Sequence, residues 1–134
     1  RLSTMTKKDI AKIAKEFGLI YYGCCEPLDK KVDILRSISN LRKVGVSPWA
    51  DVDVMAEQLR GDYVYSRKPN PAFVAVRTDP DHIRQETEAA VQACLRCGCP
   101  CDITLKDIST VNHRPENLIV WAQTVSDVLD KYYD

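Results

Sequence analysis

Apolar runs of strand length alternate with helix-patterned segments along this chain of 134 residues. Four apolar runs have the length of buried strands: residues 19–25, 41–47, 62–68 and 101–108. Five other segments carry apolar side chains at helical spacing: residues 6–18, 28–38, 51–59, 78–98 and 114–133. This alternation with short connections predicts an α/β fold built from parallel β/α repeats with right-handed crossovers.

The fourth helical segment has the clearest end signals. Asp79 stands at the N-cap position, Pro80 at the first helical position and Gly98 just past the last turn. In the first helical segment, Thr6 is expected to be the N-cap and Gly18 the stop. The second helical segment repeats its apolar side chains at Leu28, Val32, Leu35 and Ile38.

The composition argues against several classes of partner. Nineteen basic and 19 acidic side chains give a formal net charge of zero, whereas a nucleic-acid partner requires a basic excess on one face. No apolar stretch approaches the roughly 20 residues of a membrane helix, and no signal peptide opens the chain, so no membrane partner is expected. The six cysteines are therefore expected to be reduced thiols in the cytoplasm.

Polar and turn-forming residues follow each predicted strand. Parallel β/α folds place their chemistry at the carboxyl ends of the strands. Four such ends would line one rim, formed by residues 24–26, 47–51, 68–71 and 106–110. The sequence therefore predicts that a functional site, if the chain has one, lies at this rim.

The sequence "YGCCEPL" ends the first predicted strand on Cys24, Cys25 and Glu26. Cysteine often packs as a small buried hydrophobe, and that interpretation stays open. Alternatively, a thiolate at this strand end binds a soft metal or acts as a nucleophile. Glu26 would then be a second metal ligand or a proton carrier.

Two loops of the predicted rim carry candidate substrate-binding side chains. Trp49 either covers the core or stacks on a flat ligand, while Asp51 is expected to cap the following helix. Arg67 and Lys68 either bind a carboxylate or form a solvated pair. Asn70 lies between two prolines, which hold it in one orientation suited to hydrogen bonding.

The fourth predicted strand ends on Lys106 and Asp107, where a charged pair needs a reason. The two side chains either satisfy each other or face the rim. At the rim, Asp107 would be a metal ligand or an acid–base group. His113 is expected to be a surface or capping histidine.

The sequence "CLRCGCPC" places Cys94, Cys97, Cys99 and Cys101 within eight residues. A structural zinc site usually pairs two short knuckles separated by a longer loop, and this cluster lacks that spacing. The cluster is expected at the amino end of the fourth strand, opposite the rim, where stability rather than chemistry is expected. A redox or metal role for it stays open as an alternative.

Four segments together resemble a known family: "GLIYYGCCEPLDKKVDIL", "LRKVGVSPWADVD", "YVYSRKPNPA" and "ITLKDISTVNHRPENLIVWA". They are similar to the carboxyl-terminal half of the uroporphyrinogen decarboxylase-like superfamily, closest to a branch of anaerobic bacteria near the corrinoid-dependent methyltransferases. The resemblance implies strands 5–8 of a (β/α)8 TIM barrel, of which a full copy needs about 250 residues. Residues 1–134 would form a single half-barrel portion, completed by a missing amino-terminal half or by a homodimer.

The resemblance also implies a possible metal site. Thiol methyltransferases of this superfamily carry a His-x-Cys motif where this chain has "YYGCC", so that Cys24 matches the cysteine and Tyr22 stands at the histidine. Their last zinc ligand falls near Asp107, where the decarboxylases have a histidine. The implied ligand set for zinc is therefore Cys24 with Glu26 and Asp107 as substitutes.

The function implied by the resemblance is corrinoid-linked methyl transfer to a small-molecule substrate, with the corrinoid supplied by a partner protein. Zinc would lower the pKa of a thiol or a water molecule or polarise the methyl donor. Two alternatives stay open: a decarboxylase of a tetrapyrrole-like substrate, and an inactive half-barrel or binding module that self-associates. The expected catalytic residues are Glu26, Lys106 and Asp107, and the expected pocket residues are Tyr22, Cys25, Trp49, Lys68 and Asn70.

Overall fold

Helices and strands follow the predicted order, with one additional short helix between the third strand and the helix that begins at Pro80. The computed structural model describes residues 6–106 and 108–133. The elements are α1 (Lys7–Ala14), β1 (Ile20–Tyr22), α2 (Val32–Leu35), β2 (Leu41–Val46), α3 (Val52–Leu59), β3 (Val64–Arg67), α4 (Ala72–Ala75), α5 (Pro80–Cys97), β4 (Cys101–Ile103) and α6 (Glu116–Tyr133).

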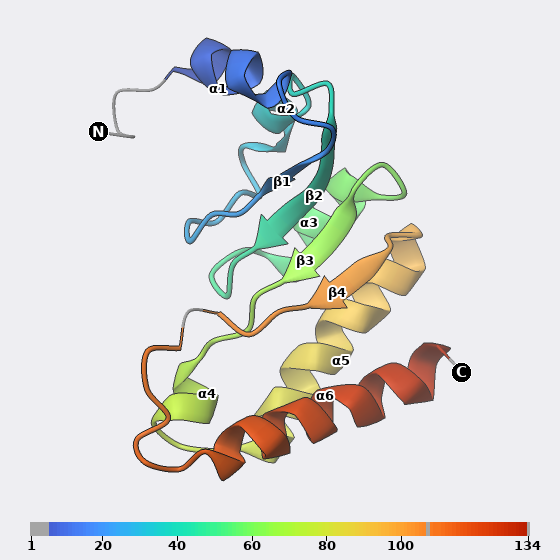
Figure 1. The fold of residues 1–134 in the computed structure, drawn as a ribbon. Helices are drawn as coiled ribbons and strands as arrows, with labels where there is room; N and C mark the ends of the chain where they lie inside the picture. The colour runs from blue at the N-terminus through green and yellow to red at the C-terminus, as the bar shows by residue number, and fades with distance from the viewer. Residues whose placement is uncertain (1–5, 107, 134) are drawn as a thin grey trace.

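The four strands form one sheet in the order β1-β2-β3-β4, and every neighbouring pair is parallel. The strand arrows in Figure 1 accordingly point the same way. Right-handed crossovers that always advance in one direction place the connecting helices on one face of the sheet. The predicted α/β fold with a parallel sheet is confirmed.

One face of the sheet packs against helices and forms the main core. Val44 of β2 and Tyr65 of β3 are fully buried there, together with Met55 and Leu59 of α3 and Ala93 of α5. Figure 1 shows α3 and α5 behind the sheet on this side. A smaller apolar cluster forms where α4, α5 and α6 meet, around Val74, Ile83 and Val125.

The opposite face, here called the open face, carries polar side chains. Because Tyr65 and Cys101 point toward the helices, their neighbours Ser66 and Asp102 point away from them. Ser66 Oγ donates to Asp102 Oδ1 at 2.7 Å, and Lys43 Nζ lies 2.5 Å from Asp102 Oδ2. Lys43 Nζ also lies 4.8 Å from the ring centroid of Tyr21. Within the described residues, no helix crosses this face in Figure 1.

The predicted helix caps are confirmed. The Asp79 side chain accepts from the backbone N–H of His82, Pro80 opens α5, and Gly98 follows it in the left-handed conformation at φ 68°. Asp51 caps α3 by accepting from the backbone N–H of Val54 at 3.0 Å.

The end predicted for the first helix was wrong. Thr6 is the N-cap, as predicted, but α1 ends at Ala14 rather than at Gly18. Asn40 Nδ2 donates to the backbone carbonyls of Ala14, Phe17 and Gly18 at 2.7, 2.9 and 3.3 Å. Asn40, from a loop later in the chain, therefore provides the hydrogen-bond donor for the carbonyls at this end of the helix.

Other elements also differ from the prediction. β1 ends at Tyr22 instead of residue 25, so Cys24 and Cys25 lie in the loop that follows it. β4 ends at Ile103 instead of residue 108, because β3 beside it stops at Arg67 before Pro69 and leaves no partner strand. The second helical segment contains only the four-residue α2, although its four periodic apolar side chains are all buried. α4 was not predicted, since two prolines made its start resemble a loop; Pro71 precedes its first turn, a position that tolerates proline.

None of the helices in residues 6–106 and 108–133 is long and apolar enough to cross a membrane.

Candidate functional site

Among the described residues, the rim consists of the segments that follow the four strands: residues 23–31, 47–51, 68–71, 104–106 and 108–110. Because all four strands are parallel, these segments lie at the same edge of the sheet (Figure 1). The structure describes every predicted site residue except Asp107, which lies outside the described residues. Lys106 is half-buried and lies three residues beyond the end of β4.

The loop after β1 holds two cysteines and a paired carboxylate. Cys24 is half-buried against the main core, and its Sγ accepts from the backbone N–H of Glu26 at 3.4 Å. Cys25 is exposed. Glu26 Oε2 lies 2.6 Å from Lys31 Nζ. This hydrogen bond lowers the pKa of the Glu26 carboxyl and raises the pKa of Lys31.

Of the three metal ligands implied by the resemblance, Cys24 and Glu26 lie among the described residues and Asp107 does not. No three His, Cys, Asp or Glu side chains there are placed together to hold a metal ion. The Cys24 thiol is a potential donor, but the Glu26 carboxylate is bound by Lys31. The described residues therefore do not by themselves fit a three-ligand zinc site.

Trp49 does not cover the core, because its side chain is 65% exposed. It borders two hollows at the rim, of about 330 and 420 Å³. The first also involves Glu26 and Lys31, and the second involves Asn70 and His82. The structure thus brings the loops after β1, β2 and β3 around one exposed indole.

Asn70 and Lys68 have different surroundings. Asn70 Oδ1 accepts from the backbone N–H of Ala72 at 3.0 Å, which leaves the amide NH₂ as its remaining donor group. Lys68 is half-buried, and its Nζ lies 5.8 Å from the ring centroid of Tyr21. A Cβ added to Gly23 would lie 3.4 Å from that Nζ, so Lys68 reaches across the edge of the sheet to the end of β1.

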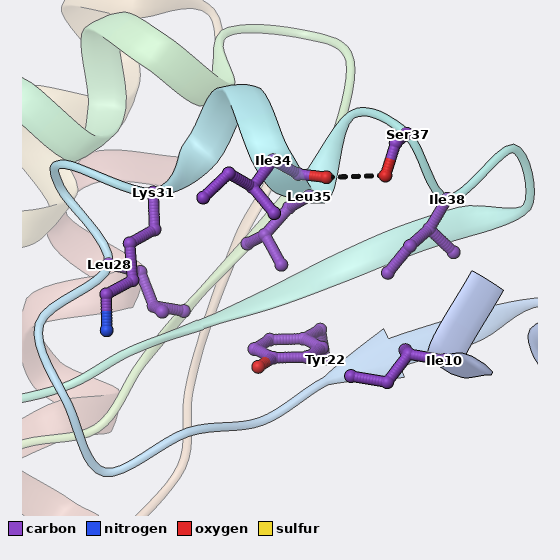
Figure 2. A pocket seen from close by; sticks show the side chains of 8 residues that line it. All are labelled: Ile10, Tyr22, Leu28, Lys31, Ile34, Leu35, Ser37 and Ile38. Carbon is purple, nitrogen blue, oxygen red and sulfur yellow. Dashed lines mark hydrogen bonds between the residues drawn. The ribbon is translucent and has the colours of Figure 1, made fainter. Parts of the chain in front are cut away.

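Tyr22 lies away from this group, on the helix side of the sheet. It pairs with Val44 in the β1–β2 ladder and packs against the main core. Its ring is one of the side chains that line an apolar cavity (Figure 2), and this cavity has a volume of about 270 Å³. The cavity is lined by Ile10, Tyr22, Leu28, Lys31, Ile34, Leu35, Ser37 and Ile38. The tyrosine that faces Lys68 and Lys43 is Tyr21, which sequence reasoning missed.

A buried ion pair fastens the rim to α5, and its role was also missed. Arg67 Nη2 lies 2.8 Å from Glu86 Oε1, and Arg67 Nη1 donates to the carbonyl of Ser47 at 2.8 Å. The Arg67 and Glu86 side chains are 5% and 14% exposed. Arg67 Nε and Ser47 Oγ have no hydrogen-bond partner among the described residues. Arg67 is therefore neither a solvated cation nor open to a substrate.

One feature of the sequence could have predicted the polar side chains Lys43, Ser66 and Asp102 on the open face. Lys43 and Asp102 are charged residues inside runs that otherwise have the character of buried strands. Such residues need a partner or a solvated face. The four clustered cysteines do lie at the amino end of β4, as predicted, and all six cysteines are thiols.

Comparison of this chain with protein-family models, with curated proteins and with solved structures found no match. Family membership therefore has no support beyond the quoted segments, and any function has to be argued from the residues themselves.

Proposed function

We propose that this chain is the carboxyl-terminal half of a (β/α)8 barrel enzyme of the uroporphyrinogen decarboxylase-like superfamily, acting in corrinoid-linked methyl transfer. The observation that carries the barrel part of the proposal is a sequentially ordered parallel sheet with one open, charged face. Parallel sheets are normally covered on both faces. Doubly wound sheets achieve this by reversing strand order, whereas a barrel closes on itself.

In this proposal the open face is part of the barrel interior. A charged pair inside a barrel must be satisfied locally, and Lys43, Asp102 and Ser66 satisfy one another. The missing amino-terminal half, or a second copy of the chain, would cover them. An inactive module that self-associates would use the same face, so the oligomeric state alone does not separate it from an enzyme.

The mouth of this interior carries positive charge suited to an anionic substrate. Lys43 and Lys68 both approach the ring of Tyr21. Lys43 already pairs with Asp102, whereas no ion pair to Lys68 is found within the described residues. We assign Lys68 to a carboxylate or sulfonate of the substrate, and the exposed Trp49 and the free amide donor of Asn70 to the planar group of a corrinoid brought by a partner protein. Lys106, Glu26 and Asp107 remain the candidate proton carriers.

The activity test uses free methylcobalamin as the methyl donor and 2-mercaptoethanesulfonate as the thiol, followed by the absorbance change of the corrinoid. We expect Lys68→Gln to raise KM for this thiol about tenfold, since one charge-assisted hydrogen bond is lost. The same variant should leave the reaction with uncharged 2-mercaptoethanol unchanged. Lys8→Gln, on the exposed surface of α1, is the matched control.

Two results would count against the proposal. Transfer no faster than in the absence of protein would remove methyl transfer as an activity of this chain. A separate measurement by light scattering tests the half-barrel. We expect a dimer that covers the open face, and a well-folded monomer would contradict closure between two halves.

A further inference from the structure

The apolar cavity beside Tyr22 lies on the helix side of the sheet, between α1, β1 and the segment that contains α2 (Figure 2). Its volume is about 270 Å³. Folded domains keep few voids larger than a water molecule, because the atoms that line an empty void lose packing contacts. A cavity of this size therefore calls for an explanation, and a bound molecule would supply the missing contacts.

The walls of the cavity come from three parts of the chain. α1 contributes Ile10, β1 contributes the ring of Tyr22, and the segment around α2 contributes Leu28, Leu35 and Ile38. These last three side chains are buried in the main core, which fixes that wall. A cavity with such a lining stays dry and accepts benzene at a volume of roughly 150 Å³. This one therefore has room for one aromatic ring with a short substituent.

Two polar groups lie at one end of the cavity. Figure 2 shows the Lys31 nitrogen and the Tyr22 hydroxyl oxygen at the same end, with Ile10 and Ile38 at the other. No hydrogen bond to the Tyr22 hydroxyl is found among the described residues. The hydroxyl is therefore available as a donor to a molecule that enters the cavity.

Lys31 stands at the mouth of the cavity and is only partly occupied. Its side chain is 49% exposed, and its Nζ lies 2.6 Å from Glu26 Oε2. The Glu26 side chain is 66% exposed, so it can turn toward solvent without leaving a buried charge unpaired. An ammonium group has several N–H donors, and within the described residues one of them is given to Glu26. The other N–H groups of Lys31 are available to a ligand.

The third polar side chain of the lining, Ser37, is already engaged. Its Oγ donates to the backbone carbonyl of Ile34 at 2.7 Å, as the dashed line in Figure 2 shows. The cavity thus has one cationic end and one apolar end. Ligand sites of this kind bind the body of a molecule through apolar contacts and orient it through a few polar groups. The charge of Lys31 selects an anionic group at the mouth.

We propose that this cavity binds a small aromatic carboxylate, with the ring inside the cavity and the carboxylate accepting hydrogen bonds from Lys31 and from the Tyr22 hydroxyl. The ring packs against the ring of Tyr22, since offset aromatic pairs gain more than their buried area alone provides. This site is separate from the proposed methyl transfer, because Lys43 and Lys68 approach Tyr21 and the cavity lies on the other side of the sheet.

Phenylacetate and its uncharged amide, phenylacetamide, are matched probes for this site. Each is titrated into the chain, the methyl signals of isoleucine and leucine are followed by NMR, and calorimetry gives the dissociation constants. We expect phenylacetate to shift the methyl signals of Ile10, Leu35 and Ile38, which line the cavity. The signals of Leu118 and Ile119, on the exposed side of α6, should not move.

Two pairs of variants separate the carboxylate from the ring. Lys31→Gln should weaken the binding of phenylacetate about tenfold and leave that of phenylacetamide unchanged, since one charge-assisted hydrogen bond is lost. Lys30→Gln, at the exposed neighbouring position, should leave both unchanged. Ile10→Phe fills the cavity and should abolish the binding of both probes. Ile13→Phe is its control, because Ile13 lies on the same helix and is 46% exposed.

Three results would overturn the proposal. They are the absence of any methyl shift at the solubility limit of phenylacetate, shifts at Leu118 and Ile119 instead of the cavity, and equal weakening of both probes by Lys31→Gln. Circular dichroism confirms the fold of each variant. If Ile10→Phe does not fold, the methyl shifts of the wild type and the two lysine variants decide the question.

Discussion

The two ends of the sheet hold their cysteines in opposite environments. At the rim, Cys24 lies beside a backbone N–H and an exposed Glu26–Lys31 ion pair, and Cys25 is exposed. At the amino end, Cys94 is fully buried in the main core, and the Cys101 sulfur lies 3.3 Å from the hydroxyl of Tyr133. Parallel β/α folds place their chemistry at the carboxyl ends of the strands, so the sequence predicted the functional site at the rim. The large pKa changes lie at the amino end instead, because burial and donor groups act there together.

The largest effect that we expect comes from the ion pair that anchors the rim. Arg67→Met should lower the free energy of unfolding by about 3–5 kcal/mol, since Glu86 is left buried without its partner. Urea denaturation measures this loss. Arg77→Met is the control, because Arg77 forms an ion pair with Asp79 but is 79% exposed. Equal effects of the two substitutions would show that the rim is not held by buried charge.

The next effect concerns thiol reactivity at the amino end. Below a pH of about 6 the Cys101 sulfur is protonated and reacts slowly; its alkylation by iodoacetamide should speed up as the pH rises through that value and then level off. Tyr133→Phe removes one donor to the thiolate, so the midpoint should move to higher pH and the rate at pH 7 should fall several-fold. Fragmentation of the tryptic peptide 97–106 by tandem mass spectrometry separates alkylation at Cys101 from alkylation at Cys97 and Cys99. An unchanged midpoint would show that Tyr133 does not lower the pKa of Cys101.

A smaller effect distinguishes the ring of Tyr65 from its hydroxyl. Tyr65→Phe deletes a buried hydroxyl that has no partner among the described residues, so stability should change by no more than about 0.5 kcal/mol. Tyr65→Ala, which also removes the ring from the core, should cost about 3–5 kcal/mol. Thermal or urea unfolding separates the two variants. A large loss of stability in Tyr65→Phe would mean that the buried hydroxyl has a hydrogen-bond partner.

The smallest effect is expected for zinc at the rim. The described residues offer the Cys24 thiol without a group of three ligands, so the chain alone should bind no more zinc than its Cys24→Ala variant. Metal analysis after equilibration with zinc and dialysis compares the two proteins. Zinc bound in equal molar ratio to the wild type, and lost in the variant, would restore the metal site that the resemblance implies.

Local patterns in the sequence were sufficient for the order of the elements and for several of their ends. The caps at Asp51 and Asp79 and the stop at Gly98 depend on atoms within one helical turn, and all were predicted. The burial of Leu28, Val32, Leu35 and Ile38 followed from their spacing alone. These features depend on neighbours in the chain, so a single sequence contains the information needed to predict them.

The partners of individual side chains were decided by the tertiary structure. Arg67 meets Glu86 across 19 positions, Asn40 ends α1 from 26 positions away, and Cys101 meets Tyr133 across 32. No periodic pattern links such residues, because their proximity depends on how the helices pack on the sheet. The sequence by itself therefore determined a parallel α/β chain with a polar rim. Only packing decided which tyrosine faces the open sheet, which arginine is buried and which thiol meets Tyr133.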